Sequence, residues 1–282
     1  MSLFDVAQSR TTRRSRVYSG RIKRSILGAG LRHPAIFLHL PKCGGTSLSE
    51  ALYATVPIHK RVGVIDALST RRAASILAFG ENDAWRCHDD LEHGHHTFDL
   101  RERLLLTHGC WNTDLIHGHV LLTDHVRKHL LGRYKLLTIM RDPVARAISN
   151  YRMAVAAGIA DPNPDIWLQS PIARAHCTTY LRYLSGQHSV TKDAETVSLV
   201  RATEALKDFA LIGFLEDIES FARAFESIFG AALSLHKYNQ AKGPEVTFTS
   251  AQQDQLYEMC AADAALYARA KELKELQDHT DE

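Results

Sequence analysis

Residues 35–47 read AIFLHLPKCGGTS, an apolar run that stops at a proline and is followed by two adjacent glycines. The run is short and rich in strand-forming residues, so it predicts a buried strand. From Thr46 onward, apolar residues recur at helical spacing through Leu48, Leu52 and Ala54. The local unit is therefore a strand, a glycine-containing turn and a helix.

Outside this unit, strand and helix patterns alternate along the chain. Short apolar runs predict further strands at residues 115–120, 134–140 and 209–214. Helical patterns are found at residues 68–79, 122–131, 144–157, 170–185, 196–208, 217–229 and 250–276. Residues 81–114 show no clear periodicity and are expected to form loops with short helices. The alternation predicts a mostly parallel sheet covered on both faces.

The composition excludes several classes of protein. The chain has 282 residues and is 45% hydrophobic, enough for a globular core, and we expect a single domain. No apolar run approaches the roughly 20 residues of a membrane span, and the basic start is not followed by a secretory signal. Five scattered cysteines, an odd number without CxxC spacing, suit reduced thiols. We therefore expect a soluble, cytoplasmic protein.

Charge is balanced overall but uneven along the chain. The net charge of +2 is too small to predict a nucleic-acid partner. Residues 10–24, however, carry seven arginines and lysines and no acid. We divide the chain into a basic N-terminal arm (1–33), a central domain (34–274) and an acidic tail (275–282). The arm is expected to be solvated and frayed, or to meet an anionic acceptor, an anionic lipid surface or another subunit, which would make a homo-oligomer.

The turn at residues 41–47 has the chemistry of an anion cradle. Glycines let the backbone approach a phosphoryl or sulfuryl group, the helix N-terminus favours an anion, and Lys42 adds a positive charge. It is not the Walker loop, because Lys42 precedes both glycines. Taken alone, the heptamer is equally compatible with an ordinary structural turn.

A second motif, RDPVARAISNY at residues 141–151, begins where a predicted strand ends. Carboxyl ends of parallel strands are where open α/β sheets bind ligands. Arg141 and Ser149, about two turns into the following helix, are therefore candidates to hold a second anionic group. The alternative for Arg141 alone is a surface ion pair with Asp142 or another neighbour.

Together, PKCGGTSL and RDPVARAISNY resemble the two nucleotide-binding motifs of sulfotransferases that use 3'-phosphoadenosine 5'-phosphosulfate (PAPS), particularly the carbohydrate sulfotransferases. The likeness covers residues 34–274 and includes LIGFLEDIESF (211–221) and DAALYARA (263–270). It implies an α/β fold with a P-loop-type parallel sheet flanked by helices, in a single domain with a helical C-terminal part. It further implies a 5'-phosphosulfate site and a 3'-phosphate site. The first maps onto Lys42, Cys43, Gly44, Gly45, Thr46 and Ser47, and the second onto Arg141 and Ser149.

Cys43 departs from the family pattern, in which threonine or another small residue is common. One interpretation is that a thiol beside a lysine at a helix N-terminus has a lowered pKa and is sensitive to oxidation. The other interpretation is that Cys43 is simply a small residue, since backbone donors do not depend on its side chain.

Transfer to a hydroxyl needs a base, and histidine titrates near neutral pH. His117 and His119 end a predicted strand, and its alternation points both to the same side, with Gly118 leaving room for a ligand. The segment HGHV resembles that of uronosyl 2-O-sulfotransferases, which implies that His119 is the catalytic base and His117 its helper. The alternative is two structural histidines with satisfied hydrogen bonds.

Two further regions have weaker signals. Residues 87–96 hold a cysteine, two aspartates and several histidines without a zinc-type spacing, so we expect a solvated loop or an acceptor-site wall and no metal. Lys242 lies in a late basic loop of the kind that covers the 3'-phosphate in related enzymes.

The sequence thus predicts a PAPS-dependent sulfotransferase in which Lys42 neutralises the leaving phosphate oxygen. The acceptor is a hydroxyl on a carbohydrate or another small metabolite. The alternatives are a nucleotide or small-molecule kinase, in which Asp142 would hold Mg²⁺, and a non-catalytic nucleotide-binding protein.

Overall fold

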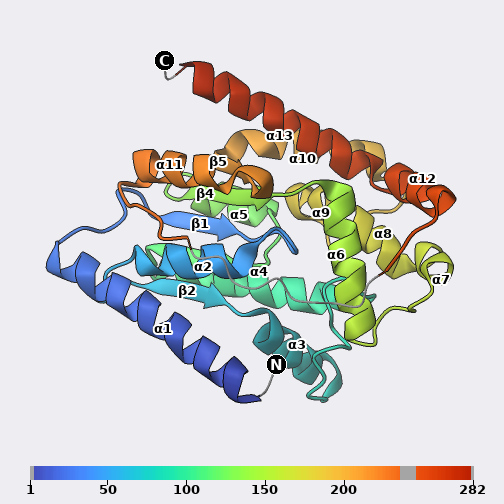
Figure 1. Cartoon of the computed structure of the whole chain (residues 1–282), viewed down its shortest axis with the longest axis horizontal. Coiled ribbons are helices and arrows are strands. Elements are labelled where there is room, and N and C mark those ends of the chain that lie inside the picture. Colours follow the sequence, from blue (N-terminus) through green and yellow to red (C-terminus); the bar gives the residue numbers. More distant parts are fainter. Residues whose placement is uncertain (1–2, 236–245, 281–282) are drawn as a thin grey trace.

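The computed structural model describes residues 3–235 and 246–280, and its centre is a five-stranded parallel sheet (Figure 1). The strands are β1 (Ala35–Leu38), β2 (Val62–Ile65), β3 (Leu115–Gly118), β4 (Lys135–Met140) and β5 (Phe209–Phe214). Their order across the sheet is β2-β3-β1-β4-β5, and each neighbouring pair is parallel. The described chain is therefore an α/β fold of one domain, as the sequence predicts.

Helices flank this sheet, with α1 beyond α2 and β2 and α13 beyond β5 in Figure 1. Their bounds are α1 (Leu3–Ile26), α2 (Gly45–Ala54), α3 (Ala67–Phe79), α4 (Gly94–Cys110), α5 (Asp124–Leu130), α6 (Pro143–Ala156), α7 (Pro164–Leu168), α8 (Pro171–Cys177), α9 (Thr179–Ser185), α10 (Glu195–Ala205), α11 (Ile218–Phe229), α12 (Ser250–Met259) and α13 (Ala261–Thr280).

Local signals explain why the helices next to the site begin where they do. Asp142 caps α6 by accepting the N–H of Ala145 at 2.8 Å, and Pro143 occupies the first turn, where its missing N–H costs nothing. Gly44 precedes α2 with a φ of 79°, a left-handed conformation that glycine adopts without strain. Each helix thus follows a strand, α6 after residues 141–142 and α2 after the longer loop 39–44.

The core is built around β1, the middle strand of the sheet. All four residues of β1 are at most 1% exposed, as expected for a parallel strand covered on both faces. From β1 the chain leads through α2 to β2 on one side of the sheet, whereas from β4 it leads to β5 on the other. The loops after the adjacent strands β1 and β4 therefore leave in opposite directions, which in open α/β sheets creates a ligand-binding crevice.

Several predicted boundaries and one predicted loop are wrong. β1 and β3 end two residues earlier than expected, at Leu38 and Gly118, and the strand β2 was not predicted. Half of residues 81–114 form the 17-residue helix α4 rather than loops with short helices. The basic arm is not frayed over its length, because residues 3–26 form α1, which packs against α2.

In the part of the chain that the structure describes, no helix combines the length and the apolar character that a membrane crossing requires.

Candidate active site

The loop after β1 forms a tight turn with two left-handed residues. Lys42 has a φ of 64° and Gly44 a φ of 79°. The φ of 79° favours glycine at position 44, and a Cβ atom there would lie 2.4 Å from Cδ1 of Leu215, so that side chain would have to shift. The turn brings the chain directly into the first turn of α2.

The N-terminus of α2 is positively polarised, and neither its cap residue nor its first turn supplies an acidic side chain. Gly44 supplies no side-chain cap, and no acidic residue lies in the first helical turn. The N–H groups and dipole of such a terminus favour an anion. Gly45, Thr46 and Ser47 form this turn, as predicted for the cradle, although the placement of their side chains is not described.

Arg141, which follows β4, lies next to the first loop. Its Nη1 donates a hydrogen bond to the carbonyl oxygen of Lys42 at 3.4 Å. Burial lowers the pKa of Lys42, and the nearby Arg141 charge lowers it further. Among the described residues no carboxylate forms an ion pair with either side chain, so the alternative for Arg141, a surface ion pair with Asp142 or another neighbour, is not formed among them. Two cations thus meet at the N-terminus of α2.

Tyr180 of α9 contacts both loops, the one after β1 and the one after β4. Its hydroxyl accepts the backbone N–H of Arg141 at 2.8 Å, donates to the carbonyl of Arg141 at 2.5 Å, and lies 3.5 Å from Sγ of Cys43. The side chain is fully buried. Nothing in the sequence marks Tyr180 among the nine tyrosines. Its role depends on Arg141, 39 positions earlier in the chain, and on Cys43, 137 positions earlier.

Cys43 points into the protein. The thiol is 2% exposed, and burial raises its pKa to about 11. The interpretation that this pKa is lowered is therefore wrong, because loss of solvation outweighs the attraction of Arg146 and Arg141. Cys43 acts as a small packing residue with a neutral thiol.

A buried ion pair holds Tyr180 in place. Arg146 of α6 is fully buried and reaches Asp263 of α13 at 3.1 Å and Thr179 at 2.6 Å. Asp263 accepts the N–H groups of Tyr180 at 2.8 Å and Leu181 at 2.9 Å. The guanidinium carbon of Arg146 also lies 4.9 Å from the centre of the Tyr180 ring. Helices α6, α9 and α13 are thereby joined behind the two loops.

The remaining predicted site residues are Ser149 and Lys242. Ser149 lies on α6 and is half-buried, and its side chain makes no hydrogen bond with any described residue, Arg141 included. Lys242 lies outside the described residues.

Three histidines gather at the ends of β1 and β3. The N–H of His39 donates to the carbonyl of Gly118 at 3.0 Å, which continues the pairing of the two strands. The His39 ring stacks on the ring of His119 at 4.2 Å and lies 5.0 Å from the ring of His117. His117 and His119 do lie on one side of the strand, and His39, which the sequence analysis missed, lies between them.

The hydrogen bond of His119 fixes its tautomer. Nδ1 lies 2.6 Å from the carbonyl oxygen of His39, and a carbonyl can only accept, so Nδ1 carries the proton. Burial lowers the pKa of His119 well below its usual value, and the ring is neutral at pH 7. Nε2 then holds a lone pair, and no described residue forms a hydrogen bond with it. This is the state that a general base requires.

His117 is engaged at both ring nitrogens. Nδ1 lies 2.6 Å from the hydroxyl of Tyr53, and Nε2 lies 3.0 Å from Oγ of Ser49 and 3.0 Å from Nδ1 of His39. Burial raises the pKa of Tyr53, so its hydroxyl stays protonated. A hydroxyl both donates and accepts, so these contacts are compatible with either tautomer of His117.

The segment at residues 87–96 supports the histidines from behind and is not a solvated loop. Arg101 donates to the carbonyl of His119 at 3.0 Å and to the two carboxylate oxygens of Asp89 at 2.6 and 2.9 Å. Arg71 donates to the same carboxylate at 2.8 Å. Asp89 and the neighbouring His88 are at most 2% exposed. The expectation of a solvated loop is wrong because Asp89 neutralises two arginines in the interior.

Comparison with protein-family models gives no match for this chain, and comparison with curated proteins gives none either. The described geometry defines a candidate active site at the carboxyl edge of the sheet. It combines a helix N-terminus with two cations that have no ion pair among the described residues, and with a neutral histidine whose Nε2 makes no hydrogen bond to any of them.

Proposed function

We propose that the chain is a sulfotransferase that moves a sulfuryl group from PAPS to an acceptor hydroxyl. The observation that carries the proposal is the contact between Arg141 and Lys42 at the N-terminus of α2. Two cations lie close together, and no described carboxylate forms an ion pair with either of them, which suits a ligand with two separate anionic groups. The sequence resemblance to sulfotransferases specifies which ligand that is.

In this proposal the 5'-phosphosulfate binds at the turn 42–47 and the 3'-phosphate binds near Arg141. Lys42 and the first N–H groups of α2 contact the sulfuryl and phosphoryl oxygens. Ser149 and Lys242 remain candidates for the 3'-phosphate. The pKa of Lys42, lowered by burial and by Arg141, rises again when an anion binds, because the anion offsets both effects.

The chemical step follows from the tautomer of His119. The acceptor hydroxyl gives its proton to Nε2 of His119 while its oxygen forms a bond to sulfur. The bond between sulfur and the phosphate oxygen breaks, and adenosine 3',5'-bisphosphate leaves with the electron pair. Lys42 stabilises the negative charge that develops on the leaving oxygen. His119 is thus a catalytic residue, whereas His117, engaged at both nitrogens, is a positioning residue that acts through His39.

Ligand-induced thermal stabilisation tests the donor site. A ligand that binds only the folded state at a hundredfold excess over Kd stabilises it by about 2.7 kcal/mol. We expect stabilisation by adenosine 3',5'-bisphosphate and none by ATP with Mg²⁺. The reverse result would favour the kinase alternative and contradict the proposal.

Paired variants separate the site from general charge effects. Lys42→Ala and Arg141→Ala are expected to abolish the stabilisation, because each removes a cation from a partly desolvated anion site. Lys135→Ala is the control, because Lys135 is an exposed cation at the amino end of β4 and Arg141 follows the carboxyl end of the same strand. Equal stabilisation in all three variants would remove the donor site from this edge of the sheet.

Transfer itself is measured with labelled PAPS against a panel of carbohydrate and small-metabolite hydroxyls. We expect product with at least one acceptor, formed at least about a hundredfold more slowly by the His119→Gln variant. A chain that binds adenosine 3',5'-bisphosphate but transfers sulfate to no acceptor would indicate a non-catalytic nucleotide-binding protein.

A further inference from the structure

Helix α1 has one face docked on the protein. Arg21 donates to the carbonyls of Val56 at 3.0 Å, Pro57 at 3.1 Å and Lys60 at 2.9 Å, and Ser25 accepts the N–H of Ile58 at 2.8 Å. A Cβ atom at Gly20 would lie 2.7 Å from Cβ of Ala54 on α2, which shows how closely the two helices pack. The orientation of α1 is therefore fixed by the body of the protein.

The opposite face of α1 carries large apolar side chains that are exposed to solvent. Tyr18 is 60% exposed, Ile22 47%, Ile26 80% and Leu27, just after the helix, 63%. Tyr18, Ile22 and Ile26 follow one another every four residues, so at 3.6 residues per turn they fall within an arc of about 80°. These four residues are called the α1 stripe below.

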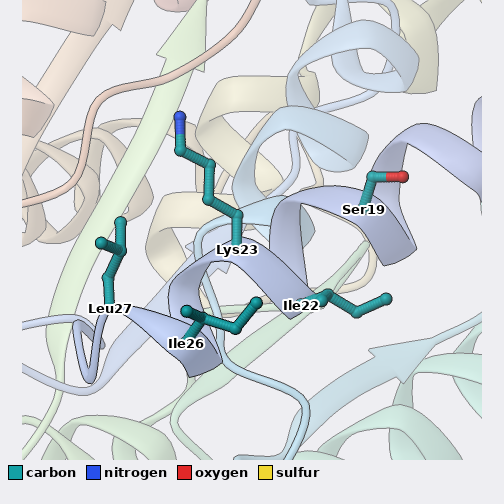
Figure 2. A pocket seen from close by; sticks show the side chains of 5 residues that line it. All are labelled: Ser19, Ile22, Lys23, Ile26 and Leu27. Atoms are coloured by element: carbon teal, nitrogen blue, oxygen red, sulfur yellow. The ribbon is translucent and has the colours of Figure 1, made fainter.

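Cations border the α1 stripe. Lys23 and Arg16 lie on the next part of the helix surface, and Arg14 lies on the other side of Tyr18; all three are exposed. Figure 2 shows Ile22 and Ile26 on the same side of the helix, with Lys23 extending from the adjoining side, and these residues line a surface pocket together with Ser19 and Leu27. Residues 6–49 contain no acidic residue that would neutralise this face.

We infer that the exposed face of α1 docks on the surface of an anionic lipid bilayer. The α1 stripe is apolar and is flanked by arginine and lysine, and the helix lies along the surface of the protein. Amphipathic helices of this kind bind to membranes by inserting their apolar side chains at the level of the headgroups, while their cations contact anionic lipids. A second copy of the chain is a poorer occupant, since a symmetric contact would place Arg14, Arg16 and Lys23 against the same cations of the other copy. The inference does not depend on the proposed sulfotransferase activity.

Vesicle sedimentation of the full chain tests this inference. The probes are vesicles of phosphatidylcholine alone and vesicles in which about one lipid in four is phosphatidylglycerol. We expect the protein to sediment with the anionic vesicles only. It should be released at about 1 M salt, where the screening length falls to about 3 Å.

Two variants and a control identify the surface. Ile22→Ser with Ile26→Ser is expected to lower the partition coefficient about tenfold or more, because it removes apolar side chains from the α1 stripe. Arg16→Gln with Lys23→Gln should lower binding to anionic vesicles in the same direction. Val197→Ser with Val200→Ser is the control, because these α10 side chains are 71% and 62% exposed and lie outside the α1 stripe. It should bind like the unaltered chain.

Several outcomes would overturn the inference. They are sedimentation with neither kind of vesicle, equal binding by the isoleucine variant and the unaltered chain, and equal loss of binding in the control. Sedimentation velocity distinguishes the remaining occupant. Concentration-dependent dimers that the isoleucine variant abolishes, without vesicle binding, would assign the face to a second copy and refute the lipid surface.

Discussion

Tyr180 and Tyr183 offer a matched pair of substitutions that tests how the two loops of the site are joined. Both lie on α9 and both are fully buried. The hydroxyl of Tyr180 bonds to the N–H and the carbonyl of Arg141, whereas the hydroxyl of Tyr183 has no hydrogen-bond partner among the described residues. Replacing each tyrosine with phenylalanine removes the same atom from two different environments.

The expected magnitudes follow from the partners left behind. Tyr180→Phe leaves a backbone donor and a backbone acceptor of Arg141 without partners, each costing about 1–3 kcal/mol when buried. Arg141 is half-buried, so water offsets part of this loss, and we expect a loss of about 2 kcal/mol in the free energy of unfolding. Tyr183→Phe removes an unsatisfied buried hydroxyl and should be neutral or slightly stabilising.

Urea denaturation of both variants, with a calorimetric Tm, is the assay. For a chain of this length the entropy of unfolding converts about 2 kcal/mol into a Tm decrease of roughly 4 °C for Tyr180→Phe. The same variant should bind adenosine 3',5'-bisphosphate more weakly, since Arg141 loses its anchor. Equal changes of Tm in the two variants would refute the assignment of Tyr180 as the residue that joins the loops.

Four further predictions follow from the site and its support. His119→Gln should lower kcat by roughly 10²- to 10⁴-fold. In a pH–rate profile, the rate of the unaltered chain should fall at low pH with a midpoint below pH 6.5, because burial lowers the pKa of His119, and this acid limb should be absent from the variant. Gly44→Ala should cost about 1–2 kcal/mol in urea unfolding, since φ is 79° and the Cβ meets a leucine side chain; an unchanged midpoint would contradict this geometry. Burial lowers the pKa of His88 to about 4, so between pH 6.5 and 4 the unfolded state binds a proton that the folded state does not. As the pH is lowered through this range, the free energy of unfolding should decrease by on the order of 3 kcal/mol. The decrease should be smaller in His88→Gln, which lacks the titrating ring. Ser149→Ala should reduce the preference for PAPS over its 3'-dephosphorylated analogue in competition binding, and an unchanged preference would exclude Ser149 from the 3'-phosphate site.

The sequence predicts those elements whose signals are local. The run 35–40 ends at a proline, and the run 134–140 ends at Arg141-Asp142-Pro143, so both strands and the helices after them are visible without tertiary information. β2 is different, because it has only four residues, includes Gly63, and leaves Val64 48% exposed at the edge of the sheet. Neither an alternating pattern nor a continuous apolar run marks it.

Helix α4 was missed for a related reason. Its buried face includes Arg101, fully buried, and Thr97, also fully buried, in positions where a periodicity analysis expects apolar side chains. Arg101 is buried because Asp89 neutralises it, and Asp89 is buried because Arg101 and Arg71 neutralise it in turn. Such mutual compensation cannot be inferred from either residue alone, so a polar segment is interpreted as solvated.

The same limit applied to the histidines of the site. His117 and His119 were found because alternation along one strand is a local property. His39 is as close to His119 as any residue of the cluster, but within the run 35–40 it is one polar residue in a predicted strand. Its role emerges only when β1 and β3 are paired, which places its carbonyl 2.6 Å from Nδ1 of His119.

The second motif shows why a sequence pattern selects a region before it selects a residue. Arg141 and Arg146 stand five positions apart in it, and either arginine is chemically suited to an anion. Arg146 forms a fully buried ion pair with Asp263, which lies 117 residues further along the chain. Asp263 also accepts the N–H of Tyr180, so Arg146 helps to hold Tyr180 and α9 in place. Arg141 has no such partner among the described residues and faces Lys42. The position of one distant carboxylate thus determines which arginine is left without an ion pair among the described residues, and this is why Arg141, and not Arg146, is the candidate for an anionic ligand.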